Sequence, residues 1–297
     1  MKKILQLLTA LSVLVFAVTA FAVANDAVDW QRGTITVKGM GVKPPNAVNE
    51  AQAIMMARRS AVVDGYRQLA EAVKGVYIDS ESTVENFLLV SDITTTKVNA
   101  VIQDAEVISE REVSGGGYEV TMRISIFGAS NSLAEAVLPR PEKREDFPQP
   151  VQSVAPSMPA YDASASVSVR IDAVSKKPAK PAPTSDAIGG YTGLIVDCRG
   201  LKLNPVMSPV IKNDSGEPIY GHKNLDPDYV IEHGMAAYTS DLQSGTERAG
   251  SNPLVVKAVK LENHNGNPVI STADANRVLI ENESTGFLDK TSVVFVR

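Results

Sequence analysis

The sequence contains a single cysteine, Cys198, among its 297 residues. One thiol excludes an intrachain disulfide framework and any zinc site built from several thiolates. Basic residues are too few for a typical nucleic-acid-binding domain, since 29 Lys and Arg stand against 34 Asp and Glu and the formal net charge is −5. Aromatic residues make up only 5%, but the hydrophobic content of 44% suffices for packed cores.

Long apolar runs are also scarce, because only the N-terminus has one. Lys2 and Lys3 precede an apolar run over residues 4–21, and a small-x-small sequence follows that ends at Ala24. This layout predicts a cleaved signal peptide over residues 1–24, with Asn25 as the first mature residue. An uncleaved membrane anchor is the alternative, since the run is nearly long enough to cross a bilayer, but no basic stop-transfer cluster follows it.

The predicted cleavage sets the expected location of the protein. The layout resembles bacterial signal peptides and indicates export to the periplasm or cell surface of a Gram-negative bacterium. No cysteine stands at the cleavage site, so no lipid anchor is expected there. Loss of Lys2 and Lys3 lowers the net charge from −5 to −7. No second long apolar run follows, so no transmembrane segment is expected in the mature chain.

Proline divides the mature chain into two parts. Residues 139–190 hold nine of the 17 prolines and are rich in Ala, Ser and Val. Because proline removes backbone donors, this stretch is predicted to be a largely disordered linker. Within it, alternating apolar residues over 163–174 could form one strand. The flanking segments, 25–138 and 191–297, each have the length of an ordinary domain.

The first segment shows clear periodic patterns. Apolar residues recur at three- and four-residue steps on a predicted helix that Asn46 caps and Gly75 ends. Arg67 and Glu71, four residues apart on this helix, are expected to pair on its surface. The predicted elements are a strand over 34–42, a helix over 46–74, a short strand over 76–84, a weaker helix over 85–98, and a hairpin of 101–113 with 118–127.

Three stretches of this segment carry a family resemblance. They are WQRGTITVKGMG (30–41), ARRSAVVDGYRQLAEAVKGV (57–76) and GGYEVTMRISIFG (116–128). Together they resemble the N-terminal domain shared by LPP-type outer-membrane lipoproteins and FlgT-type flagellar proteins. The resemblance implies an envelope protein without known catalysis, and several such proteins belong to surface or flagellar assemblies. This chain departs from the lipoprotein branch because it lacks the lipid-bearing cysteine.

The second segment mixes strand and helix patterns. Asp226 precedes Pro227, which is typical of a helix start. The predicted elements are strands over 191–198, 206–212, 253–261 and 291–296, and helices over 226–237 and from 271 or 272 to 281. The order resembles a C-terminal module, of no assigned activity, that accompanies the same N-terminal domain in other exported proteins. The predicted fold class is therefore α+β, with two small domains, each a short, mainly antiparallel sheet with helices on one face, joined by a Pro-rich linker.

Few residues suggest chemistry. Cys198 alternates with apolar neighbours and is expected to be a buried structural thiol. The histidines, His222, His233 and His264, show no spacing typical of a metal site, so neither a metal nor a cofactor is predicted. Asp197 ends a predicted strand, where catalytic carboxylates often lie, but no second carboxylate is placed beside it by any motif.

The leading hypothesis is therefore a non-catalytic exported envelope protein that acts in binding or assembly, with envelope proteins as partners and self-association left open. The alternative is a periplasmic binding module for a small molecule or cell-wall glycan, with a pocket lined by tyrosines of the second domain. Its candidate ligand-binding residues are Tyr220, His222, Asp226 and Asp197. A hydrolase that uses Asp197, His222 and Asp226 is a third hypothesis.

Overall fold

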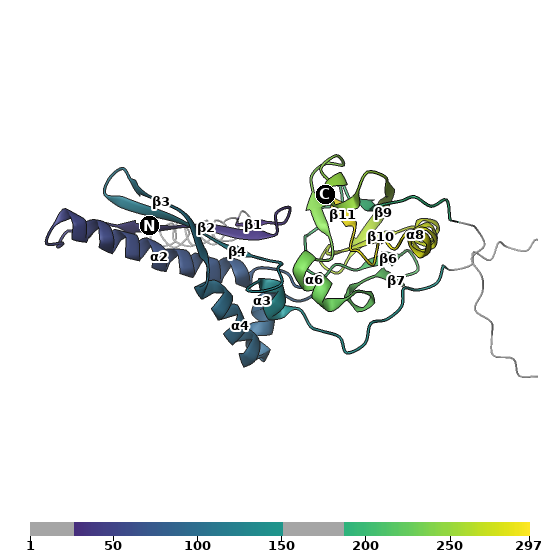
Figure 1. Cartoon of the computed structure of the whole chain (residues 1–297), viewed down its shortest axis with the longest axis horizontal. Coiled ribbons are helices and arrows are strands. Elements are labelled where there is room, and N and C mark those ends of the chain that lie inside the picture. The colour runs from purple at the N-terminus through teal and green to yellow at the C-terminus, as the bar shows by residue number, and fades with distance from the viewer. Residues whose placement is uncertain (1–26, 151–186) are drawn as a thin grey trace, which may run out of the picture.

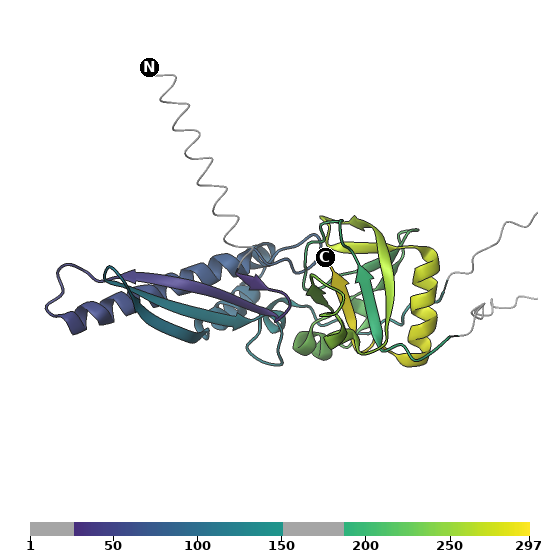
Figure 2. The ribbon, with the colours of Figure 1, turned by 90° about the horizontal axis from the view of Figure 1, so that it is seen from above.

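The computed structural model describes residues 27–150 and 187–297. Two α+β domains lie end to end and give the molecule an elongated shape (Figures 1 and 2). The predicted cleavage site at Ala24 and Asn25 lies outside the described residues, as does the alternating stretch over 163–174. The predicted α+β class is confirmed by one sheet with packed helices in each domain.

The first domain is an antiparallel sheet with the long helix α2 along one face. The strand order is β1-β2-β4-β3, and the inward side chains of β2 and β4, such as Ile35 and Met122, are fully buried. The alternate apolar side chains of these strands therefore form one face of the sheet, and this face packs against α2, as the sequence pattern predicts. The elements are β1 (Val28–Asp29), β2 (Thr34–Val42), α2 (Glu50–Lys74), α3 (Val84–Val90), α4 (Asp92–Gln103), β3 (Glu106–Val113), β4 (Gly117–Ser125) and α5 (Leu133–Val137).

Helix α2 begins four residues later than the sequence predicts. Its cap is Asn49, whose side chain accepts a hydrogen bond from the Gln52 N–H at 2.9 Å, and not Asn46. Pro44 and Pro45 hold the preceding chain in a loop, so the helix starts only after them. The predicted end of α2 at Gly75 is confirmed.

Two other expectations in this domain are corrected. The predicted helix over 85–98 is two helices, because Ser91 ends α3 and its side chain caps α4 through the Thr94 N–H. Residues 101–103 belong to α4, so the predicted hairpin starts at Glu106. The predicted strand over 76–84 is reduced to one isolated bridge between Tyr77 and Thr83.

Side chains on the exposed face of α2 form ion pairs with one another and with strand β3. Arg67 contacts Glu71 at 2.6 Å and Asp64 at 2.7 Å, which confirms the predicted i,i+4 pair. Arg58 reaches across to Glu110 of β3 at 2.7 Å. None of the helices in the described ranges is long and apolar enough to cross a membrane.

The second domain contains a seven-stranded sheet of order β7-β6-β10-β9-β5-β11-β8. Four of its six pairings are parallel, so the predicted mainly antiparallel sheet is wrong for this domain. The central strands β5 and β11 are buried almost throughout, which is typical of strands covered on both faces. Their continuous apolar runs, in place of alternation, are the signal that indicates parallel pairing.

The helices of this domain flank the sheet, and α8 lies on the side away from the first domain (Figures 1 and 2). Asp226 caps α6 and Pro227 is its first residue, as predicted. The elements are β5 (Gly193–Asp197), β6 (Ile211–Asn213), β7 (Pro218–Tyr220), the 3-10 helix η1 (His222–Asn224), α6 (Pro227–His233), β8 (Ala237–Thr239), α7 (Thr246–Ala249), β9 (Pro253–Glu262), β10 (Asn267–Ile270), α8 (Thr272–Thr285) and β11 (Val293–Val296).

A turn of the first domain, residues 77–82, inserts into the second domain, and we call this contact the joint. The Tyr77 and Ile78 carbonyls accept hydrogen bonds from the N–H groups of residues 207 and 208 at 3.0 and 2.7 Å. The buried Asn267 donates through Nδ2 to Ser80 Oγ at 2.8 Å. Backbone and side-chain bonds together fix the angle between the domains.

Apolar contacts extend the joint. Trp30 of the first domain packs edge to face on Tyr238 of the second, with ring centroids 5.7 Å apart. Phe127 lies against Gly234, and the Gly128 N–H donates to the Ile231 carbonyl at 2.9 Å. One hydrophobic cluster therefore runs through both domains. The two domains therefore pack against each other as a single unit.

The first part of the predicted linker, residues 139–150, runs along the surface of the second domain, and we call it the strap. Figure 1 shows it as the teal trace that passes along that domain. Arg140 pairs with Asp228 at 3.1 Å, and the Arg144 guanidinium donates to the Asn224 carbonyl at 2.7 Å. The Arg144 guanidinium also pairs with Asp289. The rest of the linker, up to residue 186, lies outside the described residues.

The joint gives a first testable prediction. Replacing Asn267 by alanine leaves Ser80 Oγ and the Val210 N–H without the partner that each has in Asn267. A buried polar group without a partner costs about 1–3 kcal/mol, so we expect the free energy of unfolding to fall by about 2 kcal/mol in urea titrations. Asn204→Ala, which removes an exposed bond to the His264 carbonyl, should cost about 0.5 kcal/mol or less. Equal losses in the two variants would contradict this prediction.

Candidate binding groove between the domains

A cavity of about 670 Å³ lies where the first domain, the strap and the second domain meet. We call it the interdomain groove. Its volume falls in the range of ligand-binding clefts, which often occur at domain interfaces. The first domain contributes Ile78, Asp79, Phe87 and Leu138, the strap contributes Pro139, Pro141, Glu145, Asp146 and Pro148, and the second domain contributes Ser208, Val210, Lys212, Pro218 and residues 221–224.

The strap is held as a wall of this groove by contacts near its end. The Phe147 ring stacks on Tyr220 with an interplanar angle of 3° and centroids 6.5 Å apart. The Glu145 N–H donates to the Lys223 carbonyl at 2.8 Å. Prolines in between fix the backbone without needing donors. These contacts hold the strap against the second domain, where it closes one side of the groove.

His222 is the one predicted candidate that lines the groove. It begins η1, and its Nε2 is buried without a hydrogen-bond partner in the described part of the chain. Burial lowers the pKa of the imidazole below its usual value, because charge is disfavoured away from water. At pH 7 the ring is neutral, and its Nε2 can accept or donate one hydrogen bond, depending on the tautomer.

The charged side chains of the groove are unevenly compensated. Lys212 pairs with Glu262 at 3.2 Å, and Lys223 lies 3.8 Å from Glu145. Asp79 accepts only from the N–H groups of its own turn, and neither Asp79 nor Asp146 pairs with a cation among the described residues. The groove thus presents two carboxylates whose charge is not neutralised.

None of the four tyrosines proposed to line a pocket, Tyr191, Tyr220, Tyr229 and Tyr238, lines the groove, and Tyr238 lines a separate pocket with Arg248 and Val294. The Tyr220 hydroxyl donates to the Met235 carbonyl at 2.6 Å, and the Tyr238 hydroxyl donates to the Val206 carbonyl at 2.8 Å. Burial raises the pKa of both phenols. Tyr229 stacks on His233, at 4.2 Å between centroids, and Tyr191 is partly buried against the core.

The two acidic candidates are engaged elsewhere. Asp197 forms a two-pronged pair with Arg199, at 2.8 and 2.7 Å, and these bonds hold the pKa of Asp197 below its usual value. Asp226 caps α6 through the Tyr229 N–H at 2.9 Å. Neither lines the groove. The set proposed for a hydrolase, Asp197, His222 and Asp226, is joined by no hydrogen bond or ion pair in the described structure.

Cys198 has the buried position that the sequence predicts, with 0% of its surface exposed. Burial raises the pKa of the thiol to about 12, so thiolate is scarce at pH 8. We expect iodoacetamide to label native Cys198 far more slowly than the urea-unfolded chain, by at least about 100-fold in a mass-spectrometric time course. Equal rates in the native and unfolded protein would contradict this burial.

The same shift predicts a loss of stability at high pH. Above about pH 9 the unfolded chain releases the thiol proton, whereas the folded chain keeps it up to about pH 12. The folded state then binds more protons, so the free energy of unfolding should fall as pH rises through this window. Cys198→Ala should show a shallower fall than the wild type between pH 9 and 11.

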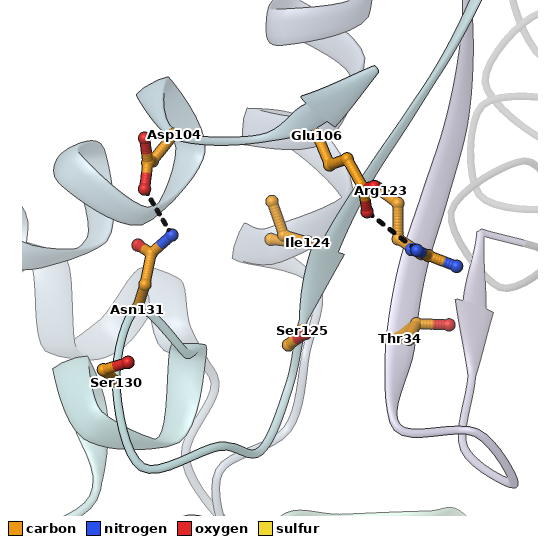
Figure 3. Close-up of a pocket in the computed structure, with 8 residues that line it drawn as sticks. All are labelled: Thr34, Asp104, Glu106, Arg123, Ile124, Ser125, Ser130 and Asn131. Carbon is orange, nitrogen blue, oxygen red and sulfur yellow. Dashed lines mark hydrogen bonds and ion pairs between the residues drawn. The ribbon is translucent and has the colours of Figure 1, made fainter. Parts of the chain in front are cut away.

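A smaller, more polar pocket of about 470 Å³ lies in the first domain at the end of β4 (Figure 3). Its side chains already satisfy one another, since Arg123 pairs with Glu106 at 2.7 Å and Asn131 donates to Asp104 at 2.6 Å. No buried polar atom without a partner lines it. The interdomain groove is therefore the stronger candidate site.

The other histidines do not join a site. His264 contacts the Ser80 carbonyl through Nδ1 at 3.0 Å and so belongs to the joint. Across residues 27–150 and 187–297, no group of three His, Cys, Asp or Glu side chains could hold a metal ion. Sequence patterns missed Asp79, Phe87 and Asp146, because the groove gathers them from segments far apart in the chain.

Comparison with known proteins gives one finding. Residues 193–297 match a family model described as the second domain of Treponema pallidum Tp0624. The match begins at β5 and includes every strand of the seven-stranded sheet. No curated protein matches the chain.

Proposed function

We propose that this chain is a non-catalytic, exported protein of the bacterial cell envelope that acts in binding or assembly, and that it binds a partner protein in the interdomain groove. The observation that carries the proposal is the groove across the joint, with walls from three separate segments. A rigid groove loses little entropy when a partner binds, which favours recognition. The N-terminal signal pattern and the family resemblance of the first domain support the envelope location.

Binding is favoured over catalysis by the state of the polar groups. The acids that sequence reasoning offered for hydrolysis are tied up in a salt bridge and a helix cap. In the groove, His222 Nε2 has no hydrogen-bond partner among the described residues, so no carboxylate orients the ring through that atom as it would a general base. Apolar walls with a few convergent polar groups are typical of a recognition site.

The packed domains also suit a role in assembly. Because the joint and the shared hydrophobic cluster fix the two domains relative to each other, a partner that contacts both senses one rigid surface. We infer that the domains act as one unit, in place of two modules that reach separate partners. A flagellar or surface structure is the assembly that the resemblance favours.

The proposal can be tested by filling the groove. Pro218 is exposed and lines it, so Pro218→Trp should block the site while the fold is kept. Val259, which is 55% exposed on β9 and does not line the groove, provides the control Val259→Trp. In intact cells, chemical crosslinking should yield a partner adduct with wild type and Val259→Trp that Pro218→Trp loses.

Retention of the adduct in Pro218→Trp would contradict the groove as the partner site. Export is tested separately by N-terminal sequencing of the protein from the periplasmic fraction. We expect Asn25 as the first residue. An intact Met1 in a cytoplasmic fraction would contradict the envelope location.

A further inference from the structure

We propose that the interdomain groove binds a peptide segment of the partner that presents a lysine or arginine side chain between apolar residues. This inference rests on the proposed function and names the chemistry of its partner. It combines three properties of the groove, which are its uncompensated negative charge, the neutral ring of His222 and its apolar walls.

Charge gives the first reason. Both lysines of the groove already have carboxylate partners, at 3.2 and 3.8 Å, whereas Asp79 and Asp146 have no cationic partner among the described residues. A cation that enters the groove therefore meets uncompensated negative charge. An anion would meet the same charge as repulsion, so the groove selects against acidic segments.

His222 gives the second reason. Its ring lines the groove and is neutral at pH 7, because burial lowers its pKa. A neutral ring adds no positive charge that would oppose a cation.

The apolar walls give the third reason. Ile78, Phe87 and Leu138 line the groove together with the proline rings of the strap. Lysine and arginine have long methylene stems that pack on such surfaces while the charged end reaches a polar group. Apolar residues next to the lysine or arginine in the peptide would cover the rest of the apolar wall. For this reason we propose that the ligand is a peptide segment and not a single side chain.

The test uses the full mature chain and three capped tripeptides, in which lysine, norleucine or glutamate stands between two leucines. Norleucine has the lysine stem without the amine. Isothermal titration should show the lysine peptide binding about two- to fivefold more tightly than the norleucine peptide, as expected for a partly exposed ion pair. The glutamate peptide should bind most weakly, and added salt should reduce the preference for lysine.

Matched variants locate the preference. Asp79→Asn with Asp146→Asn keeps the shapes and an acceptor for the turn at Asp79, and should abolish the preference for lysine over norleucine. Glu283→Gln, an exposed change on α8 outside the groove, should keep it. The single variant Asp146→Asn, at an exposed position of the strap, should lower the preference even if the double variant folds poorly.

Equal binding of the lysine and norleucine peptides, tighter binding of the glutamate peptide, or an unchanged preference in the double variant would each overturn the inference. Tighter binding of free hexylamine than of the lysine peptide would overturn the assignment to a peptide. None of these results bears on whether Pro218→Trp loses its partner adduct in cells, so the inference can fail while the proposed function stands.

Discussion

Replacing Gly41 by valine should unfold or severely destabilise the first domain. A Cβ atom at this position would lie 2.0 Å from the Ala57 carbonyl oxygen and 2.6 Å from the Ala61 nitrogen. Both obstacles are backbone atoms of α2, so no rotamer change can relieve the overlap. The strand and helix would have to separate, and apolar contacts between the helix and β2 would be lost along with them.

We expect the cost to be about 3 kcal/mol or more, at the upper end of overpacking substitutions. Gly39 is in the same position, since a Cβ atom there would lie 2.1 Å from the Ala61 carbonyl oxygen, and Gly39→Val should behave alike. Urea unfolding followed by circular dichroism measures both. Because the two domains share one hydrophobic cluster, we also expect the unfolding transition of the second domain to become less cooperative in these variants.

The control is Gly75→Ala. Gly75 follows α2 with a φ of −77°, and its Cβ would lie 3.6 Å from the nearest heavy atom outside its immediate neighbours. Both values are ordinary for alanine, so stability should change by about 0.5 kcal/mol or less. A similar small effect in Gly41→Val would show that β2 and α2 are not in close contact.

Replacing Glu281 by alanine should destabilise the second domain by about 3 kcal/mol. This carboxylate is fully buried on α8, where Oε1 and Oε2 accept hydrogen bonds from the Ile188 and Gly189 N–H groups, each at 2.8 Å. Arg277, one turn earlier, lies 2.6 Å from Oε1 as an ion pair. Alanine would leave two donors and one partly buried cation without their partner.

Glu281→Gln should cost less than Glu281→Ala, because it keeps one of the two acceptor oxygens, although its NH2 group replaces the other and the charge is lost. Glu283→Gln provides the matched control, since Glu283 is exposed on the same helix and should change the free energy of unfolding by about 0.5 kcal/mol or less. Hydrogen exchange at Ile188 and Gly189 should accelerate in Glu281→Ala and stay unchanged in Glu283→Gln. Unchanged exchange in Glu281→Ala would contradict the role of this carboxylate.

Local sequence signals predicted the elements well where a short stretch contains the cause. The cap at Asp226, the end of α2 at Gly75 and the hairpin strands of the first domain depend on neighbours within a few residues. The start of α2 is not decided by the local sequence, because Asn46 and Asn49 can both cap a helix. Only the loop set by the prolines decides between them.

The second sheet was harder to predict. Strands β5 and β11 lie about 100 residues apart in sequence and are parallel neighbours in the sheet. The short strands β7, β8 and β10 have too few residues for a periodic pattern. Their pairing depends on the central strands, so their positions could not be read locally.

The candidate site shows the same division. Burial of Cys198 follows from alternation with its neighbours and was predicted. Tyr220 is predicted to line a pocket, but its side chain is buried in the core, where its hydroxyl donates a hydrogen bond to the Met235 carbonyl. The groove itself is lined by residues from 78 to 224, and no spacing rule connects them.

The single cysteine by itself determines that the chain has no intrachain disulfide framework, because each disulfide needs two thiols. The sequence also determined the α+β class, since the periods of strand and helix are local properties. Only the tertiary structure decided that the two domains pack as one unit and that the start of the proline-rich stretch forms a wall of a groove. Those features depend on contacts between distant segments, which form only when both cores are folded.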